Sequence, residues 1–397
     1  MKKILISGLY GVNNLGDDYI CLSIVSNLYG RYGGNIEITV ISNGDNLVWL
    51  RRWYPNCKIV NNNGNKYRNV VLTINEIIKA DYFIIGGGGL WPSESKKQLI
   101  LQKLYIKIAV RFCCKVLFFG VEVNELKSEW PKEYWRYFIR NSYGIITRNA
   151  QSVRMLSDIM QDNSDKLYES ADVTLAFKTL EETNEENRIA DKVLPDSGFL
   201  LLALAQPWTD AEMTETHFKN RYDKFVSQIV NVVNTQMRGG GGYSSAVFLP
   251  FYGGSDIKLI KDIVTGLSEF AVKVIDPDFP IGYKRMLFKQ AKHVIAMRFH
   301  SVLFSLYYAT PFTAISYSGK TSDLMKENGI SEHMVEFGIR DNQFFYKEFD
   351  LDQEVLEAII NENLDSKEYK EKLINVSHSL KECALSGFAK LFEFLDE

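Results

Sequence analysis

The strongest chemical signal in the chain is an arginine and a histidine separated by one residue, Arg298 and His300. They follow an apolar run at 293–296 that is typical of a buried strand. Residues 300–308 then have the apolar spacing of a helix. A guanidinium in this position can hold a phosphate or carboxylate through two parallel hydrogen bonds. An imidazole can act as a general acid near neutral pH. A single histidine is more often structural, but the arginine beside it at a strand end favours a catalytic pair.

Two other strand ends in the same half of the chain carry residues suited to an anionic ligand. Ser255 and Asp256 follow a predicted strand at 246–250, and we expect their side chains to cap the next helix. Lys320 follows a predicted strand at 313–317 and offers another cation, with an ordinary surface lysine as the alternative. We therefore assign donor binding to Arg298, Lys320, Ser255 and Asp256, and catalysis to His300 and Arg298.

A glycine turn near the N-terminus could approach a second ligand. Gly11 follows a predicted strand at 4–6, and Asn14, Asp17 and Asp18 precede a predicted helix. Glycine lets the backbone come close to a ligand, and the start of a helix favours an anion. The two carboxylates could instead simply cap the helix. We assign this loop to acceptor binding.

Four consecutive glycines follow another predicted strand, at 81–85, and include Gly87 and Gly88. Ordering four glycines costs backbone entropy, so such a run indicates a need for close approach or for a positive φ angle. It predicts either a wall of the acceptor site, to which we assign Gly87 and Gly88, or a tight turn from strand to helix. It is not a phosphate-binding Walker loop, because no Gly-Lys-Ser/Thr follows.

These motifs lie on an alternation of strands and helices that occurs twice. A polar, charged segment at 178–196 separates the two series and predicts a linker. The sequence therefore predicts an α/β fold with two Rossmann-like, doubly wound parallel-sheet domains facing a cleft, as in the GT-B architecture. The predicted domains are residues 1–185, on the acceptor side, residues 196–345, on the donor side, and a helical tail at 346–397.

Composition excludes several classes of protein. The 397 residues include 46 Lys+Arg and 49 Asp+Glu, a net charge of −3 without a basic block, which argues against nucleic acid as a partner. Five cysteines and five histidines show no metal-ligand spacing, so we expect no metal site and reduced thiols in the cytoplasm. No apolar stretch reaches the roughly 18 residues of a transmembrane helix.

Taken in order, several segments resemble the polysaccharide pyruvyl transferase family. They include GLYGVNNLGDD, IIGGGGL, LPFYGGSD and MRFHSVLF, and the family's arginine-x-histidine element falls on Arg298 and His300. The resemblance implies a GT-B-like fold and transfer of pyruvate from phosphoenolpyruvate to a sugar of a capsule or exopolysaccharide, giving a cyclic ketal. The implied chemistry needs no cofactor and does not require a metal, although any metal requirement is left open. Glu122 departs from the pattern, because a glycine is common at that position.

The chemistry that the resemblance implies suits these residues. His300 would protonate the methylene carbon of the donor, while Arg298 and Lys320 would hold the phosphate and carboxylate. The sequence does not identify a base for the sugar hydroxyl, and Asp17 and Asp18 are candidates for that role. A sugar-nucleotide glycosyltransferase of the same architecture, or a non-catalytic glycan-binding protein, remains the alternative.

The sequence leaves the setting of the protein open. The acceptor can be free or lipid-linked, and a lipid-linked acceptor would bring the chain to the inner face of the membrane. The amphipathic stretch at 99–114 would then be a contact, although a core helix is the favoured interpretation. A homo-oligomer is also left open.

Overall fold

The chain forms two compact units. One comprises Met1–Leu180 with Ser379–Glu397, and the other comprises Glu181–His378. The computed structural model describes residues 1–45, 47, 49–62, 64–91, 95–123, 126, 128–160, 165–177, 198–209, 211–239, 241–340, 345–348 and 350–397. The predicted linker at 178–196 lies outside these residues. Each unit is built on a parallel sheet with helices, which confirms the predicted fold class.

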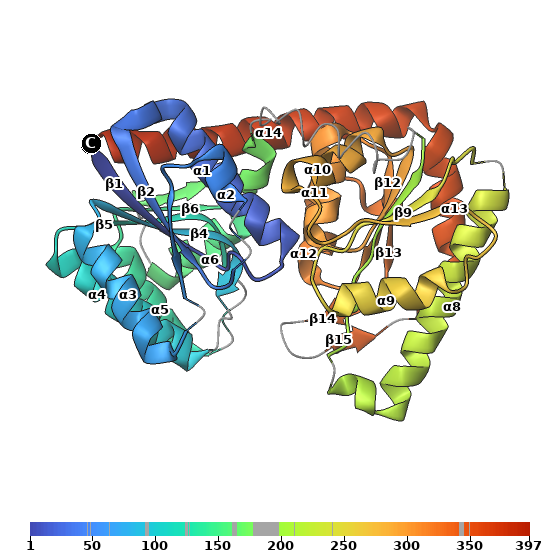
Figure 1. Ribbon diagram of the computed structural model, residues 1–397, viewed down its shortest axis with the longest axis horizontal. Helices are drawn as coiled ribbons and strands as arrows, with labels where there is room; N and C mark the ends of the chain where they lie inside the picture. Colours follow the sequence, from blue (N-terminus) through green and yellow to red (C-terminus); the bar gives the residue numbers. More distant parts are fainter. Residues whose placement is uncertain are drawn as a thin grey trace. The chain divides into compact units, whose positions relative to one another are not determined.

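The first unit contains a seven-stranded sheet with the order β3-β2-β1-β4-β5-β6-β7, in which every pair is parallel (Figure 1). The strand order reverses between β1 and β4, and open parallel sheets bind ligands at the carboxyl ends of strands at such a point. The strands are β1 (Lys2–Ser7), β2 (Ile36–Ser42), β3 (Lys58–Asn61), β4 (Tyr82–Trp91), β5 (Lys115–Val123), β6 (Gly144–Thr147) and β7 (Leu167–Glu169).

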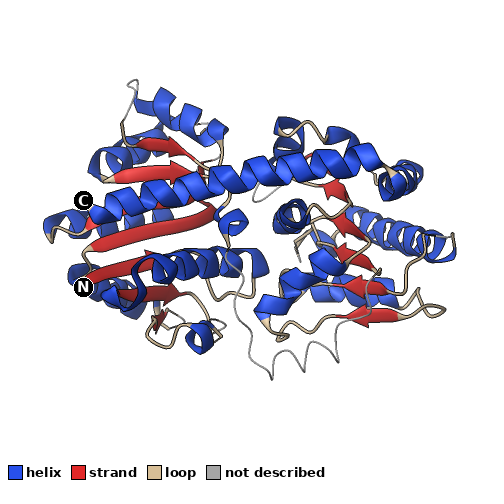
Figure 2. Ribbon diagram, turned by 90° about the horizontal axis from the view of Figure 1, so that it is seen from above, coloured by secondary structure: helices blue, strands red, loops and turns tan. Residues whose placement is uncertain are grey.

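Helices cover both faces of this sheet. One face packs against apolar side chains of α3, α4, α5 and α6, including Ile77, Ile106 and Trp135. The other face packs against α1 and the end of α14, where Phe119 lies 4.8 Å from Phe388 between ring centroids (Figure 2). The helical elements are α1 (Leu15–Tyr32), η1 (Gly33–Asn35), α2 (Leu50–Trp53), α3 (Lys66–Lys79), α4 (Lys96–Arg111), α5 (Glu129–Asn141), α6 (Ala150–Met160) and η2 (Val173–Ala176).

The second unit contains a six-stranded parallel sheet with the order β10-β9-β8-β11-β12-β13, which reverses between β8 and β11. A separate antiparallel pair is formed by β14 and β15. The strands are β8 (Leu200–Ala203), β9 (Ala246–Phe248), β10 (Val272–Val274), β11 (His293–Ala296), β12 (Phe312–Ser316), β13 (Met334–Glu336), β14 (Gly338–Arg340) and β15 (Phe345–Glu348). The helical elements between them are η3 (Glu212–Thr214), α8 (Thr216–Arg238), α9 (Ser255–Val264), α10 (Ile281–Gln290), α11 (Phe299–Tyr308), α12 (Gly319–Glu327) and η4 (Ser331–His333).

The predicted tail at 346–397 is helical, as expected, beyond β15. It holds α13 (Gln353–Asp365) and α14 (Lys367–Asp396), and its side chains contribute to the cores of both units. Leu356 and Ile360 of α13 lie in the core of the second unit. At the other end of the tail, Tyr82 in the first unit donates a hydrogen bond of 3.0 Å to the Leu395 carbonyl. Among the described residues, no helix combines the length and the apolar character needed to cross a bilayer.

Candidate functional site

Arg298, which follows β11, is held by the carboxylate of Asp256, which follows β9 of the same sheet. Its Nε donates a 3.1 Å hydrogen bond to Asp256 Oδ2, and its Nη2 donates a second one to Asp256 Oδ1. Nη1 lies 3.4 Å from the Tyr317 hydroxyl oxygen and donates to it. The Asp256 side chain is fully buried, whereas that of Arg298 is 23% exposed. Asp256, Arg298 and Tyr317 therefore link the residues that follow β9, β11 and β12 at the carboxyl edge of the second sheet.

This environment keeps the guanidinium charged. Burial opposes the charge of Arg298, but the neighbouring Tyr317 and Asp256 outweigh it and raise the pKa of the arginine above its ordinary value. Because Asp256 occupies one edge of the planar guanidinium, the orientation of the remaining edge is fixed. A fixed cation of this kind can bind a phosphate or carboxylate.

The prediction that Ser255 and Asp256 cap the next helix was wrong. Gly254, with a φ of 86°, is the N-cap residue of α9, and Ser255 is the first residue of the helix. Asp256 instead accepts hydrogen bonds from the backbone N–H of Phe251, at 3.3 Å, and of Tyr252, at 2.9 Å. Its carboxylate thus closes the loop after β9 and also orients Arg298, which follows β11.

His300 and Lys320 begin the two helices that follow these strands. His300 lies in the first turn of α11, half-buried, with its ring centroid 5.5 Å from that of Phe299 and 6.3 Å from that of Phe304. Lys320 is the second residue of α12 and follows Tyr317, the partner of Arg298. The structure therefore brings Arg298 and Asp256 into contact and places the histidine and the lysine at the same sheet edge.

Sequence reasoning missed Gln206 and Arg285. Gln206 follows β8, at the point where the strand order reverses, and is only 7% exposed. Its Nε2 donates to the Trp208 carbonyl at 3.2 Å, while its Oε1 has no hydrogen-bond partner in the described part of the chain. Its position after a buried strand was a usable signal. Arg285 is buried with its guanidinium 3.7 Å from the ring centroid of Tyr307, a contact that only the packing of α10 on α11 creates.

The glycine loop of the first unit is fixed by its own polar side chains. Asn14 is the N-cap of α1, and its Oδ1 accepts the N–H of Gly16 at 3.2 Å. Its Nδ2 donates to Asp17 at 2.6 Å, and Asp18 accepts the N–H of Gly11 at 2.8 Å. Both aspartates are buried. The helix cap is therefore Asn14, and Asp18 holds the shape of the loop; the acceptor-binding role of these residues stays a prediction.

Gly87 and Gly88 lie inside β4, which continues to Trp91 rather than ending before the glycines. The tight-turn interpretation was therefore wrong. Gly87 has a φ of 86°, and a Cβ added there would lie 2.4 Å from Cγ2 of Ile20. The glycine is needed because α1 packs directly onto this strand, and Gly88 pairs with Val121 of β5. Their predicted contact with an acceptor remains a prediction.

Glu122 belongs to a buried ionic network that the sequence did not predict. Arg148 donates through Nη2 to Glu122 and through Nη1 to Asp172, the latter at 2.9 Å. The three side chains are 9%, 4% and 3% exposed for Glu122, Arg148 and Asp172. Burial opposes the charge of Arg148, but the two carboxylates raise its pKa overall. The buried Glu122 is thus matched by an arginine at the end of β6.

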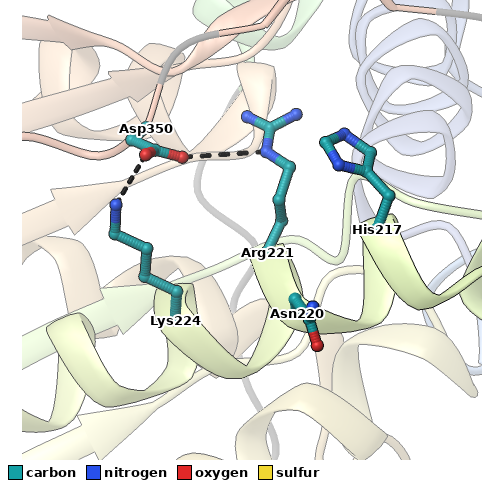
Figure 3. Close-up of a pocket in the computed structure, with 5 residues that line it drawn as sticks. All are labelled: His217, Asn220, Arg221, Lys224 and Asp350. Carbon is teal, nitrogen blue, oxygen red and sulfur yellow. Dashed lines mark hydrogen bonds and ion pairs between the residues drawn. The ribbon is translucent and has the colours of Figure 1, made fainter.

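A separate charged pocket of about 450 Å³ lies on α8 (Figure 3). Asp350 contacts Lys224 at 2.5 Å and Arg221 at 3.8 Å, and His217 lies one helical turn before Arg221. Its lining residues are His217, Asn220, Arg221, Lys224 and Asp350. These come from elements other than those that carry Arg298 and His300.

The family assignment follows from a match over most of the chain. Residues 14–319 match the model of a family described as polysaccharide pyruvyl transferase. The chain belongs to the polysaccharide pyruvyl transferase family. Arg298 and His300 lie within the matched residues, and the match ends one residue before Lys320. No curated protein matches the chain.

Solved structures of the same fold are distant in sequence. UDP-GlcNAc 2-epimerase from Methanocaldococcus jannaschii is 15% identical, with a TM-score of 0.61 over 92% of this chain and 94% of that one. The Neisseria meningitidis UDP-GlcNAc 2-epimerase, bound to UDP-GlcNAc, is 12% identical, with a TM-score of 0.62 over 99% and 100%. Anabaena HepE, in complex with UDP and glucose, is 13% identical, with a TM-score of 0.55 over 100% of both chains. These likenesses confirm the predicted GT-B-like fold of this pyruvyl transferase family member.

Proposed function

We propose that this chain transfers the pyruvyl group of phosphoenolpyruvate to a sugar of a surface polysaccharide or glycan intermediate and forms a cyclic ketal. The observation that carries the proposal is the Arg298 guanidinium, anchored on one edge by the buried Asp256 and placed two residues before His300. Family membership supports a pyruvyl transferase. The anchored cation supports an anionic donor that carries a phosphate or a carboxylate.

In the proposed reaction, the His300 imidazolium gives a proton to the methylene carbon of the donor, which leaves positive charge on the neighbouring carbon. A sugar hydroxyl forms a bond to that carbon, the bond from the carbon to the phosphate oxygen breaks, and phosphate leaves. A second hydroxyl of the same sugar then closes the ketal. Arg298 and Lys320 offset the charge of the phosphate and the carboxylate throughout.

The acceptor side is assigned to the loops of the first unit. We propose that Gly11, Asn14, Asp17 and Asp18 bind the sugar together with the backbone of Gly87 and Gly88. Asp17 and Asp18 remain the candidates for accepting hydroxyl protons.

The five cysteines are all free, which supports a cytoplasmic setting where thiols stay reduced.

Donor binding tests the proposal without knowledge of the acceptor. The melting temperature is measured with phosphoenolpyruvate, UDP-sugars, GDP-sugars and NAD, and a ligand at 100 times its dissociation constant adds about 2.7 kcal/mol to stability. We expect a shift with phosphoenolpyruvate that Arg298→Ala abolishes. Arg238→Ala is the matched control, because Arg238 forms an ion pair with Glu269 in which both side chains are exposed, at 62% and 67%.

A sugar-nucleotide transferase is the competing function, and the UDP ligands of the fold relatives belong to those proteins. A shift with UDP-sugars alone would favour that function and overturn the pyruvyl transfer. With a glycan acceptor, phosphate release together with the mass gain of a pyruvate ketal would establish the reaction itself. Glycan binding without turnover would support the non-catalytic alternative.

A further inference from the structure

Helices α3 and α4 each carry exposed apolar side chains. Tyr67, Val71 and Ile78 of α3 are 84%, 55% and 40% exposed. Ile100 and Leu104 of α4 are 51% and 41% exposed. The two helices contact each other on one face of the first sheet (Figure 1). We call these five side chains, with the cations of the two helices, the α3–α4 surface.

Helical spacing places these side chains on stripes that point away from the core. Tyr67 and Val71 are four residues apart, as are Ile100 and Leu104, so each pair lies on one side of its helix. Other side chains of each helix are buried in the core of the first unit, among them Ile77 and Ile106. The exposed apolar groups are therefore in excess of what the core requires.

The same two helices are strongly cationic, although the whole chain carries a net charge of −3. The only carboxylate in either helix is Glu76, whose side chain is 11% exposed and which pairs with Lys58 at 2.6 Å and Lys79 at 3.0 Å. The cations of the two helices are Lys66, Arg68, Lys79, Lys96, Lys97, Lys103, Lys107 and Arg111. Eight positive charges against one carboxylate leave this surface positive in a chain that is slightly acidic.

The exposed apolar residues of α14 lie among charges of both signs. Ile374 and Leu385 of α14 are 58% and 51% exposed, but that helix also carries Glu368, Glu371 and Glu382 among its lysines. The combination of exposed apolar side chains with a large excess of cations therefore distinguishes the α3–α4 surface from α14.

We propose that the α3–α4 surface docks on an anionic lipid bilayer. Apolar side chains on one side of a helix enter the boundary between headgroups and acyl chains, while lysine and arginine stems reach to the anionic headgroups. Each cation near such a surface adds attraction that salt screens. A partner protein would have to match the cations with a dense acidic patch, and the apolar stripes with a complementary groove; a bilayer supplies both without a specific shape.

Vesicle flotation of the full chain tests the proposal. One set of vesicles contains phosphatidylcholine alone, and the other contains phosphatidylcholine with about one third phosphatidylglycerol. We expect flotation only with the anionic vesicles, and its loss when the salt concentration is raised from about 0.05 to 0.5 M, where the Debye length falls severalfold. Equal binding to both vesicle types, or binding that salt leaves unchanged, would overturn the proposal.

Two pairs of variants assign the binding to this surface. Ile100→Ser with Leu104→Ser, and separately Lys96→Glu with Lys107→Glu, should each lower the partition coefficient at least about tenfold. The matched controls are Ile374→Ser with Leu385→Ser, and Lys219→Glu with Lys289→Glu, which should bind as the parent does. All four double variants replace exposed side chains, so circular dichroism should show the parent fold.

The remaining outcome is a protein occupant. If light scattering shows that the parent self-associates without lipid, and that Ile100→Ser with Leu104→Ser makes it monomeric, the surface is an interface between copies and the lipid proposal is wrong. The vesicle measurement involves no substrate, so its failure leaves the proposed pyruvyl transfer untouched, and the reverse also holds.

Discussion

The Arg298 guanidinium and the Asp256 carboxylate form a two-point ion pair between the residues that follow β11 and those that follow β9. One partner is fully buried and also accepts two backbone N–H groups of its own loop. The other partner keeps an edge directed to Tyr317 and away from Asp256. A cation fixed in this way needs no rearrangement to meet an anionic group.

Asp256→Asn should therefore affect stability and catalysis together. Removing one charge of a buried pair costs about 3 kcal/mol, and a displaced Arg298 should lower kcat/KM about 100-fold. Urea unfolding and steady-state kinetics measure the two effects. Asp350→Asn is the control, because its partner Lys224 is 53% exposed and such pairs contribute at most about 1 kcal/mol. Equal effects of the two substitutions would contradict the anchoring role of Asp256.

His300→Gln should remove the proton donor without removing the donor site. We expect kcat to fall about 10²–10⁴-fold, while the dissociation constant of phosphoenolpyruvate changes little because Arg298 and Lys320 remain. Calorimetry and single-turnover kinetics separate the two quantities. His378→Gln, on the exposed side of α14, should leave both unchanged. Near-normal turnover in His300→Gln would exclude this residue as the acid.

The ionic network of the first unit predicts strong non-additivity. Arg148→Met leaves Glu122 and Asp172 buried without their cation and should destabilise the protein by about 3–5 kcal/mol. Adding Glu122→Gln and Asp172→Asn to the same chain should recover most of this loss, because no buried charge then remains. Denaturant unfolding provides the comparison, with Arg154→Met on the exposed side of α6 as the control. Additive losses would show that the three groups do not act as a unit.

Docking of the C-terminal helix on the first sheet depends on Gly387. A Cβ there would lie 2.1 Å from Ser170 Oγ and 2.6 Å from its Cβ. Gly387→Ala should therefore cost about 1–3 kcal/mol, since either the helix or the serine must shift. Gly34→Ala should be neutral, because no atom of the described residues lies within 4 Å of a Cβ added at that position. The melting temperatures of the two variants are compared with that of the parent. An unchanged melting temperature in Gly387→Ala would contradict the close packing.

Acid should destabilise the chain partly through His293. Complete burial lowers the pKa of His293 from 6.5 to about 3, and its Nε2 lies 3.0 Å from Thr313 Oγ1. Between these two values the unfolded chain binds a proton that the folded chain does not, so stability falls as the pH falls from 6.5 towards 3. The slope from this group is about 1.4 kcal/mol per pH unit. The free energy of unfolding is measured for the parent and for His293→Gln between pH 7 and pH 4. It should depend less steeply on pH in the variant. Parallel curves would exclude His293 as a source of the slope.

The sequence by itself was enough for the fold class and for the positions of the strand-end motifs. Buried strands of a parallel sheet are short apolar runs, and the residues after them are polar or glycine because they leave the core. Arg298, His300 and Lys320 are recognisable for this reason. Helix limits were less well predicted. The first helix was expected after Asp18, whereas α1 begins at Leu15 because Asn14 caps it.

What each polar group does was decided by tertiary structure. The sequence predicted that Asp256 caps a helix, but in the structure it anchors Arg298. The strand order β9-β8-β11 brings the loop after β9 close to the start of α11. The four glycines predicted either an acceptor-site wall or a tight turn. They are part of β4, and α1 packs against Gly87. Arg148 gave no signal at all, because its carboxylate partners are 26 and 24 residues away in sequence. Apolar periodicity is local and can be read along the chain, whereas the pairing of charges depends on strand order, which only the folded sheet sets.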